Sequence, residues 1–208
     1  MLPLEEFSSQ KVRVTQVKHL AKIRLFLLRF LRPLIIFLGN VHMPFSRKKI
    51  KGRHYLAVKG LIKPGMVIVT NTHGELTSAL IPGKWSHTGI YVGNDMVIEA
   101  TGSGVVKTDL ITFMLTKDEI TLVSPIFADS MQRLRAAQHA EYFVGKSYDY
   151  DFNPNNDAFY CSELVIACYS KAFNNELPFE VRERFGTETV TPDDIVLAER
   201  KWLKVWAS

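Results

Sequence analysis

Cysteine is scarce in this chain, which has only two among its 208 residues, Cys161 and Cys168. Two cysteines are too few for the disulfide framework of a small secreted domain. If both lie on one helix, their spacing separates them by about 10 Å along its axis, so we expect no bond between them. The chain does not need such a crosslink, because a domain of this length buries roughly 70% of its unfolded surface.

Sequence signatures of metal and nucleotide sites are also missing. The chain has no Cys-x-x-Cys or His-Glu-x-x-His spacing. The turn Gly102-Ser103-Gly104 lacks the third glycine of a dinucleotide fingerprint, and no Walker-type lysine follows it. We find no internal repeat and no low-complexity tract. We therefore expect neither a metal nor a cofactor.

Acidic residues are rare in the first quarter of the chain. Residues 1–55 contain 12 Lys and Arg against 2 Asp and Glu, a balance of +10, whereas residues 56–208 contain 14 against 19, a balance of −5. A uniformly basic surface, the usual mark of duplex binding, is therefore disfavoured, and we expect no nucleic-acid partner. The division predicts a basic, apolar helical extension (1–55) and a catalytic or binding body (56–208).

The extension contains one long apolar stretch, residues 18–38, but this stretch is charged throughout. As a helix it has a wide apolar arc and an opposite cationic stripe, made of Lys18, Lys22, Arg29 and Arg32. The arginines within the stretch and Pro33 disfavour a membrane span, and no small-residue cleavage site follows, as a signal peptide requires. Two interpretations remain: residues 18–53 lie on an anionic membrane surface, or the apolar arc packs on the body. We expect a cytoplasmic protein, either free or peripheral on the inner face of the membrane.

The body changes from strand patterns to helix patterns along the chain. Lys63-Pro64-Gly65 is a turn signal before an apolar, β-branched run, and the alternating segments that follow predict a hairpin. Later, Thr191-Pro192-Asp193-Asp194 is a helix start with threonine as the N-cap. We predict strands at 66–70, 86–92, 96–100, 105–107 and 119–123, and helices at 129–144 and 158–173 with a polar loop at 149–157. This order predicts an α+β fold.

Cys161 and His87 are the candidates for nucleophilic catalysis. Cys161 follows a loop and lies near the start of a predicted helix, where the helix dipole and a neighbouring imidazolium would favour the thiolate. His87 occupies a polar position in a predicted strand, and Glu99 falls within a residue or two of opposite it in the hairpin, where a carboxylate can orient the imidazole. From spacing alone, a surface pair and a small buried thiol are the commoner outcomes for such residues.

Six segments of the body, in order, resemble the YiiX/YebB-like permuted papain-fold cysteine amidases, relatives of the NlpC-type cell-wall peptidases. They are K-P-G-M-V-I-V, W-S-H-T-G-I-Y-V-G, V-I-E-A, G-K-S-Y-D-Y-D-F, F-Y-C-S-E-L-V and T-P-D-D-I, and the resemblance covers residues 56–200. It implies a circularly permuted papain-like fold, with a small antiparallel sheet or barrel packed on helices. It also implies site roles: Cys161 as nucleophile, His87 as general base, Glu99 as the third member, and Tyr148 and Tyr160 in support.

The resemblance implies a cysteine hydrolase that cleaves an amide bond through an acyl-enzyme. Its substrate would be a peptide or an amino-acid amide, cell-wall fragments included. Two alternatives stay open. The same triad can act on lipid acyl groups at a membrane surface, as in the lecithin:retinol acyltransferase-like branch of the superfamily. Alternatively, the chain is a non-catalytic, membrane-attached domain that holds a ligand in the papain-like cleft.

Overall fold

The computed structural model of the protein describes residues 50–72, 83–153, 156–176, 181–184, 187–198 and 201–208. The amphipathic helix expected within residues 18–38 lies outside the described residues. Within the described part, no helix is both long enough and apolar enough to cross a membrane.

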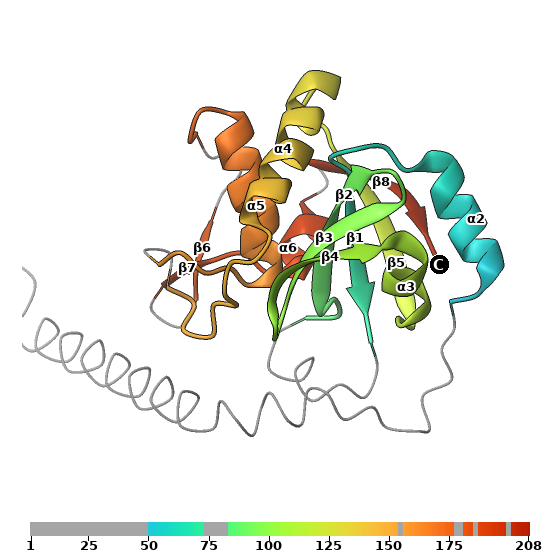
Figure 1. Ribbon diagram of the computed structural model, residues 1–208, viewed down its shortest axis with the longest axis horizontal. Coiled ribbons are helices and arrows are strands. Elements are labelled where there is room, and N and C mark those ends of the chain that lie inside the picture. Colours follow the sequence, from blue (N-terminus) through green and yellow to red (C-terminus); the bar gives the residue numbers. More distant parts are fainter. Residues whose placement is uncertain (1–49, 73–82, 154–155, 177–180, 185–186, 199–200) are drawn as a thin grey trace, which may run out of the picture.

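A six-stranded antiparallel sheet forms the centre of the fold, with strand order β4-β3-β2-β1-β5-β8 (Figure 1). Its strands are β1 (Val67–Asn71), β2 (His87–Gly93), β3 (Met96–Thr101), β4 (Gly104–Asp109), β5 (Glu119–Pro125) and β8 (Trp202–Ala207). The first five agree with the predicted strands to within two residues. The sequence did not predict β8, which forms by pairing with the free edge of β5. Two short strands, β6 (Arg182–Arg184) and β7 (Thr187–Thr189), form a separate hairpin.

Two turns set the register of the sheet. Before β1, the Met66 backbone N–H donates to the Lys63 carbonyl over 3.0 Å, and Gly65 has the positive φ of 85° that the third position of a type II turn requires. Between β2 and β3, Asn94 and Asp95 both have positive φ, 52° and 57°, as in a type I′ hairpin turn. The hairpin is therefore short and tight, and a bulge between Tyr91 and Gly93 shifts its register by one residue beyond the turn.

The helices are α2 (Gly52–Leu61), α3 (Leu110–Leu115), α4 (Ser130–Phe143), α5 (Cys161–Ala172) and α6 (Pro192–Leu197). The predicted N-cap of α6 is confirmed, because the Thr191 hydroxyl accepts the Asp194 backbone N–H. The sequence did not predict α2 and α3, and α2 crosses the proposed boundary between residues 55 and 56.

Helix α5 begins at Cys161, three residues later than the predicted start at Ala158. The reason is that Ala158 pairs with Ser147 in an isolated bridge, and the Phe159 backbone N–H donates to the Ser147 carbonyl over 3.0 Å. Tyr160 is then the extended N-cap residue. This correction places Cys161 at the very first position of the helix.

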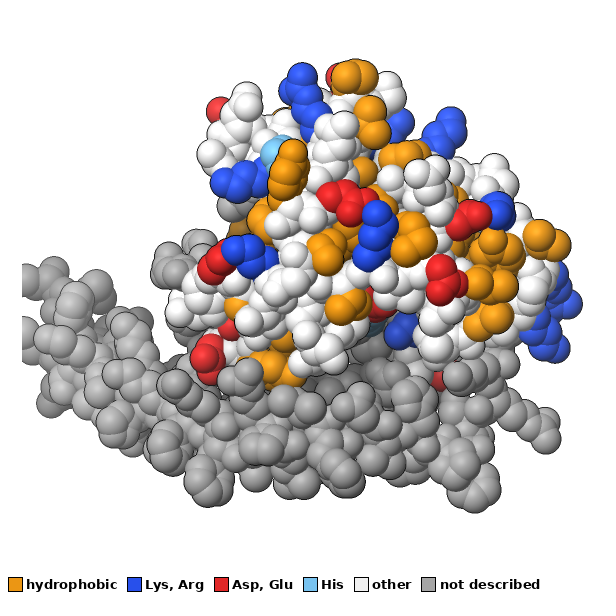
Figure 2. All heavy atoms as spheres, viewed as in Figure 1, with side chains coloured by type: hydrophobic (Ala, Val, Ile, Leu, Met, Phe, Trp, Pro, Cys, Tyr) orange, Lys and Arg blue, Asp and Glu red, His pale blue; other side chains and the backbone are white. Residues whose placement is uncertain are grey.

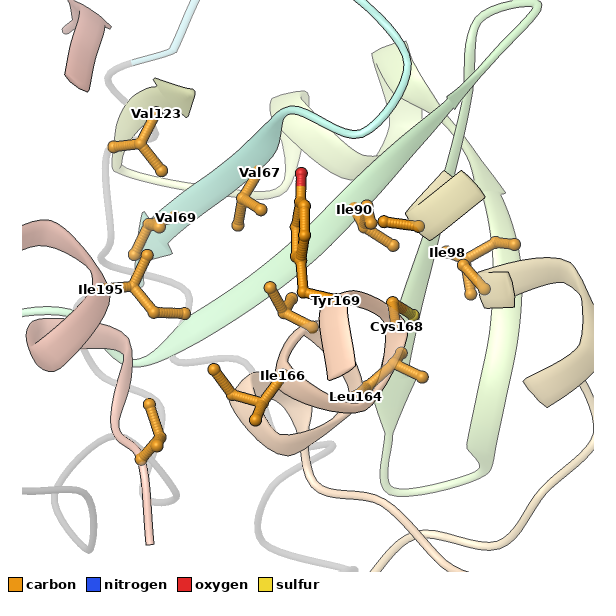
Figure 3. Close-up of a cluster of buried hydrophobic side chains, with 14 of the residues drawn as sticks. Val67, Val69, Ile90, Ile98, Val123, Leu164, Ile166, Cys168, Tyr169 and Ile195 are labelled. Atoms are coloured by element: carbon orange, nitrogen blue, oxygen red, sulfur yellow. The ribbon is translucent and has the colours of Figure 1, made fainter. Parts of the chain in front are cut away.

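The sheet has a hydrophobic cluster on each face. Alternate residues of a strand point to opposite faces. Val67 and Val69 accordingly join residues of α4, α5 and α6 in one cluster (Figure 3), while Ile68 joins residues of α2 and α3 in the other. Cys168 lies in the first cluster, and both cysteines are free thiols, as expected.

Candidate active site

His87 and Glu99 form a buried pair in the β2–β3 hairpin. Glu99 lies directly opposite Gly89, so His87, two residues before Gly89, is its diagonal neighbour on the same face. The His87 Nε2 atom is 2.7 Å from Glu99 Oε2, and the two side chains are only 17% and 9% exposed. The interpretation of an ordinary surface pair is therefore wrong for these two residues.

The second oxygen of Glu99 is held by Thr108 on β4. The Thr108 hydroxyl donates to Glu99 Oε1 over 2.6 Å. Val106 is the residue opposite Glu99 in the β3–β4 ladder, so Thr108 is again a diagonal neighbour on the same face. A diagonal row of hydrogen-bonded side chains thus crosses three strands. Sequence analysis missed Thr108, because no motif marks it and only the register of β4 brings it to Glu99.

Phe113 of α3 supports the imidazole of His87. The two ring centroids are 5.9 Å apart, with an interplanar angle of 35°. Gly89 leaves room for this arrangement, since a Cβ atom built there would be 2.5 Å from Val97 Cγ1 and 2.9 Å from Phe113 Cε2. Lys117 Nζ lies 5.7 Å from the centre of the same Phe113 ring.

Cys161 lies near His87, the first residue of β2. Cys161 is the first residue of α5 and only 3% exposed, and its thiol interacts with the imidazole of His87, which acts to lower the pKa of the thiol. Burial acts to raise the pKa of the thiol, but its interactions with His87 and with the nearby backbone N–H and hydroxyl of Thr88 outweigh burial, so the pKa is lowered. The start of a helix also favours a negative charge. The structure thus favours a thiolate at this position.

The electrostatics of the imidazole and the carboxylate follow from the same contacts. Burial lowers the pKa of His87, but the bonds to Cys161 and Glu99 outweigh burial and raise it to about 9. Burial likewise acts against the Glu99 carboxylate, yet His87 and Thr108 lower its pKa to about 2. The charge of Lys117 also lowers the pKa of both groups, but its effect is smaller than that of the hydrogen bonds. At neutral pH these contacts favour imidazolium between two anions.

The two tyrosines expected to support the site both lie near Cys161. Burial and then the charge of Cys161 raise the pKa of Tyr148, whose ring centroid is 4.7 Å from that of Tyr150. Tyr160 precedes Cys161 directly, and its phenol oxygen accepts the Val190 backbone N–H over 3.2 Å. Burial raises its pKa as well, so both phenols are neutral at neutral pH.

A buried thiol bonded to an imidazole, which is itself held by a carboxylate, is the arrangement of cysteine hydrolases. Here it stands on an antiparallel sheet and the start of a helix, and the histidine precedes the cysteine in sequence. Among the described residues, no group of three or more His, Cys, Asp or Glu side chains is placed to hold a metal ion. Fold and site together define a papain-like thiol hydrolase with permuted chain order.

A protein-family model described as "Permuted papain-like amidase enzyme, YaeF/YiiX, C92 family" matches residues 61–204. The chain belongs to this family, and the circularly permuted papain-like fold expected from the sequence is confirmed. It is therefore a cysteine amidase in the general sense, a hydrolase rather than a non-catalytic binding domain.

Comparisons with individual proteins add one similar structure. The chain is similar to metalloprotein yiiX from Escherichia coli O157:H7, for which a crystal structure is known, with 28% sequence identity and a TM-score of 0.47. The match covers 54% of this chain and 67% of that one. No curated protein matches the chain.

Proposed function

We propose that this enzyme cleaves an amide bond in a peptide or an amino-acid amide, with Cys161 as nucleophile, His87 as acid and base, and Glu99 as the group that orients His87. The observation that carries the proposal is the hydrogen-bonded row from His87 through Glu99 to Thr108, together with the interaction of the Cys161 thiol with His87. The pKa of Cys161 is lowered and that of His87 is raised to about 9, and both directions favour a thiolate–imidazolium pair.

In this mechanism the Cys161 thiolate attacks the substrate carbonyl carbon, and backbone N–H groups at the start of α5 stabilise the oxyanion. The His87 imidazolium donates its proton to the leaving amine as the C–N bond breaks, which leaves a thioester on Cys161. Neutral His87 then takes a proton from a water molecule that attacks the thioester. The C–S bond breaks, the carboxylic acid leaves, and the thiolate–imidazolium pair is restored. Glu99 holds the imidazole in place throughout.

The pH dependence of kcat/KM tests the pairing of His87 with Glu99. Because the pKa of His87 is raised to about 9, the imidazolium persists below this pH and activity falls as the pH rises through it. Glu99→Gln removes the carboxylate that stabilises the imidazolium, so the alkaline limb should move to lower pH by about one to two units. The measurement is a pH–rate profile on a peptide amide.

A matched control for that profile is Glu141→Gln, which removes an exposed carboxylate that pairs with Lys107 at 2.6 Å. The alkaline limb of this variant should coincide with that of the unmodified enzyme. An alkaline limb that Glu99→Gln leaves in place would show that Glu99 does not set the protonation of His87.

Thr88 is expected to stabilise the thiolate. Its side chain is fully buried, its hydroxyl has no hydrogen-bond partner within the described part of the chain, and Thr88 acts to lower the pKa of Cys161. Thr88→Val keeps the shape but removes the O–H, and should raise the pKa of Cys161 by about one unit. Thr88→Ser should restore it. The readout is the pH dependence of Cys161 alkylation.

Thr121→Val is the control for Thr88, because Thr121 is an equally buried threonine on β5 whose hydroxyl donates to the Trp206 carbonyl over 3.0 Å rather than to a group of the site. This substitution should leave the pH dependence of alkylation unchanged. Equal shifts in Thr121→Val and Thr88→Val would mean that Thr88 has no specific effect on the thiolate.

A second candidate function is acyl hydrolysis or transfer on a lipid at a membrane surface. The observation that favours it is the set of exposed apolar side chains on α2 and α3. Rates on acyl esters and acyl amides embedded in vesicles, compared with rates on soluble peptide amides, separate the two candidates. Hydrolysis of the soluble amides alone supports the first proposal.

A further inference from the structure

We propose that α2 and α3 form a surface that docks the protein on an anionic lipid membrane. We call this the α2–α3 surface and define it by four apolar and two basic residues: Leu56, Leu61, Ile111, Leu115, Lys51 and Arg53. The proposal goes beyond the proposed function, because docking does not depend on the catalytic roles of Cys161, His87 or Glu99.

The apolar part of the surface is exposed although the opposite side of each helix is buried. Leu56 is 68% exposed and Ile111 is 43% exposed, whereas Val58 on α2 and Phe113 on α3 are buried in the core below them. Ile111 and Leu115 are four residues apart and therefore lie on one side of α3. Figure 2 shows hydrophobic side chains gathered over this part of the molecule, with lysine and arginine side chains beside them. The arrangement fits burial in the headgroup region of a bilayer.

The basic part of the surface lies at the N-terminus of α2. Lys51 is the N-cap residue, Arg53 lies in the first turn, and no acidic residue accompanies them there. Cations at this end of a helix are unfavourable, because the helix dipole is positive there. Desolvation and then the charges of Arg53 and Lys51 lower the pKa of His54. Within the described ranges neither side chain has an acidic partner, so this positive potential is not neutralised by the body.

The acidic residues near this surface are already engaged. Asp95 pairs with Lys59, with 2.5 Å between Lys59 Nζ and the carboxylate. Asp109 accepts the Thr112 backbone N–H as the N-cap of α3. Asp109 keeps its negative charge, but Lys51 and Arg53 outnumber it, so the net charge of the surface is positive and complementary to anionic lipid headgroups.

The part of the chain outside the structure adds charge of the same sign. Residues 1–49 end immediately before this surface and contain 10 Lys and Arg against 2 Glu. Basic residues next to an anionic leaflet contribute to binding together, at about fivefold in affinity for each. This continuity favours an anionic membrane over an uncharged apolar partner.

Cosedimentation of the full chain with phosphatidylcholine vesicles, with and without phosphatidylserine, tests the proposal. We expect binding only to vesicles that contain phosphatidylserine, and weaker binding at high salt. Leu56→Glu should lower the affinity by about tenfold or more, because an apolar contact is lost. The double substitution Lys51→Glu and Arg53→Glu should lower it by about fivefold or more for each residue.

Leu197→Glu is the matched control, because Leu197 is 72% exposed but lies on α6, whose buried residues join the cluster on the other face of the sheet. Its vesicle binding should equal that of the unmodified chain, and thermal unfolding should show all variants folded. Cys161→Ala should also bind normally, so loss of catalysis and loss of docking are distinguishable. An affinity for vesicles that stays unchanged in Leu56→Glu and in the Lys51→Glu, Arg53→Glu variant overturns the proposal. So does a loss of thermal stability in Leu56→Glu beyond that of the control, since residues 18–38 or a second copy would then cover the surface.

Discussion

Cys161→Ala is expected to lower kcat/KM for amide hydrolysis by roughly a thousandfold or more, because a methyl group cannot attack the carbonyl carbon. Cys168→Ala should leave activity nearly unchanged. Cys168 is fully buried in the cluster beside the sheet, and burial raises the pKa of its thiol, so it is neither accessible nor ionised. The same chain thus offers a reactive cysteine and a matched unreactive one.

Alkylation followed by mass spectrometry of the peptides measures this difference directly. At near-neutral pH iodoacetamide should modify Cys161 and leave Cys168 unmodified, because only the Cys161 thiol has a lowered pKa. Equal modification of both thiols, or residual hydrolysis by Cys161→Ala close to that of the unmodified enzyme, would contradict the proposed nucleophile.

Gly89→Ala is expected to damage both stability and catalysis. The backbone at Gly89 suits any residue, but the space is occupied, since an added Cβ would come within 2.5 Å of Val97 and 2.9 Å of Phe113. Either the strand or Phe113 must move, and overpacking of this kind costs about 1–3 kcal/mol. Phe113 supports the His87 ring, so displacement should also lower kcat, by about a hundredfold for a shift near 1 Å.

Denaturant unfolding and steady-state kinetics measure the two effects. Gly60→Ala is the control, because nothing lies within 4 Å of a Cβ built at Gly60. Within a helix this change should stabilise the protein by about 0.5–1 kcal/mol. Adding Phe113→Leu to Gly89→Ala should recover part of the lost stability, since the smaller side chain makes room. A Gly89→Ala protein as stable and active as Gly60→Ala would mean that this contact does not constrain His87.

Local patterns were sufficient for much of the fold. The β-branched run after Pro64 and Gly65, the hairpin on both sides of Asn94, and the N-cap at Thr191 depend on neighbours in sequence, and the structure has them where they were predicted. The start of α5 was predicted three residues too early. The signal there was the apolar pattern of the helix, whereas the true start depends on a contact between Ala158 and the distant Ser147.

Helices α2 and α3 and strand β8 left no usable pattern. The two helices are 10 and 6 residues long, so few positions are available for a periodic signal. Strand β8 is at the edge of the sheet and exists by pairing with β5, which is far away in sequence. Whether short helices and edge strands of this kind form depends on the surface against which they pack.

For the site, the sequence by itself determined the residue types and one short-range relation. A short hairpin around Asn94 brings His87 to within a residue or two of the position opposite Glu99, whereas the bulge between Tyr91 and Gly93 decides that the two side chains share one face. Only the tertiary structure decided that this pair is buried, that Thr108 and Phe113 hold it, and that the start of α5 brings Cys161 to it. The physical reason is that burial and register between distant segments depend on the packing of the whole sheet against its helices, which no local pattern contains.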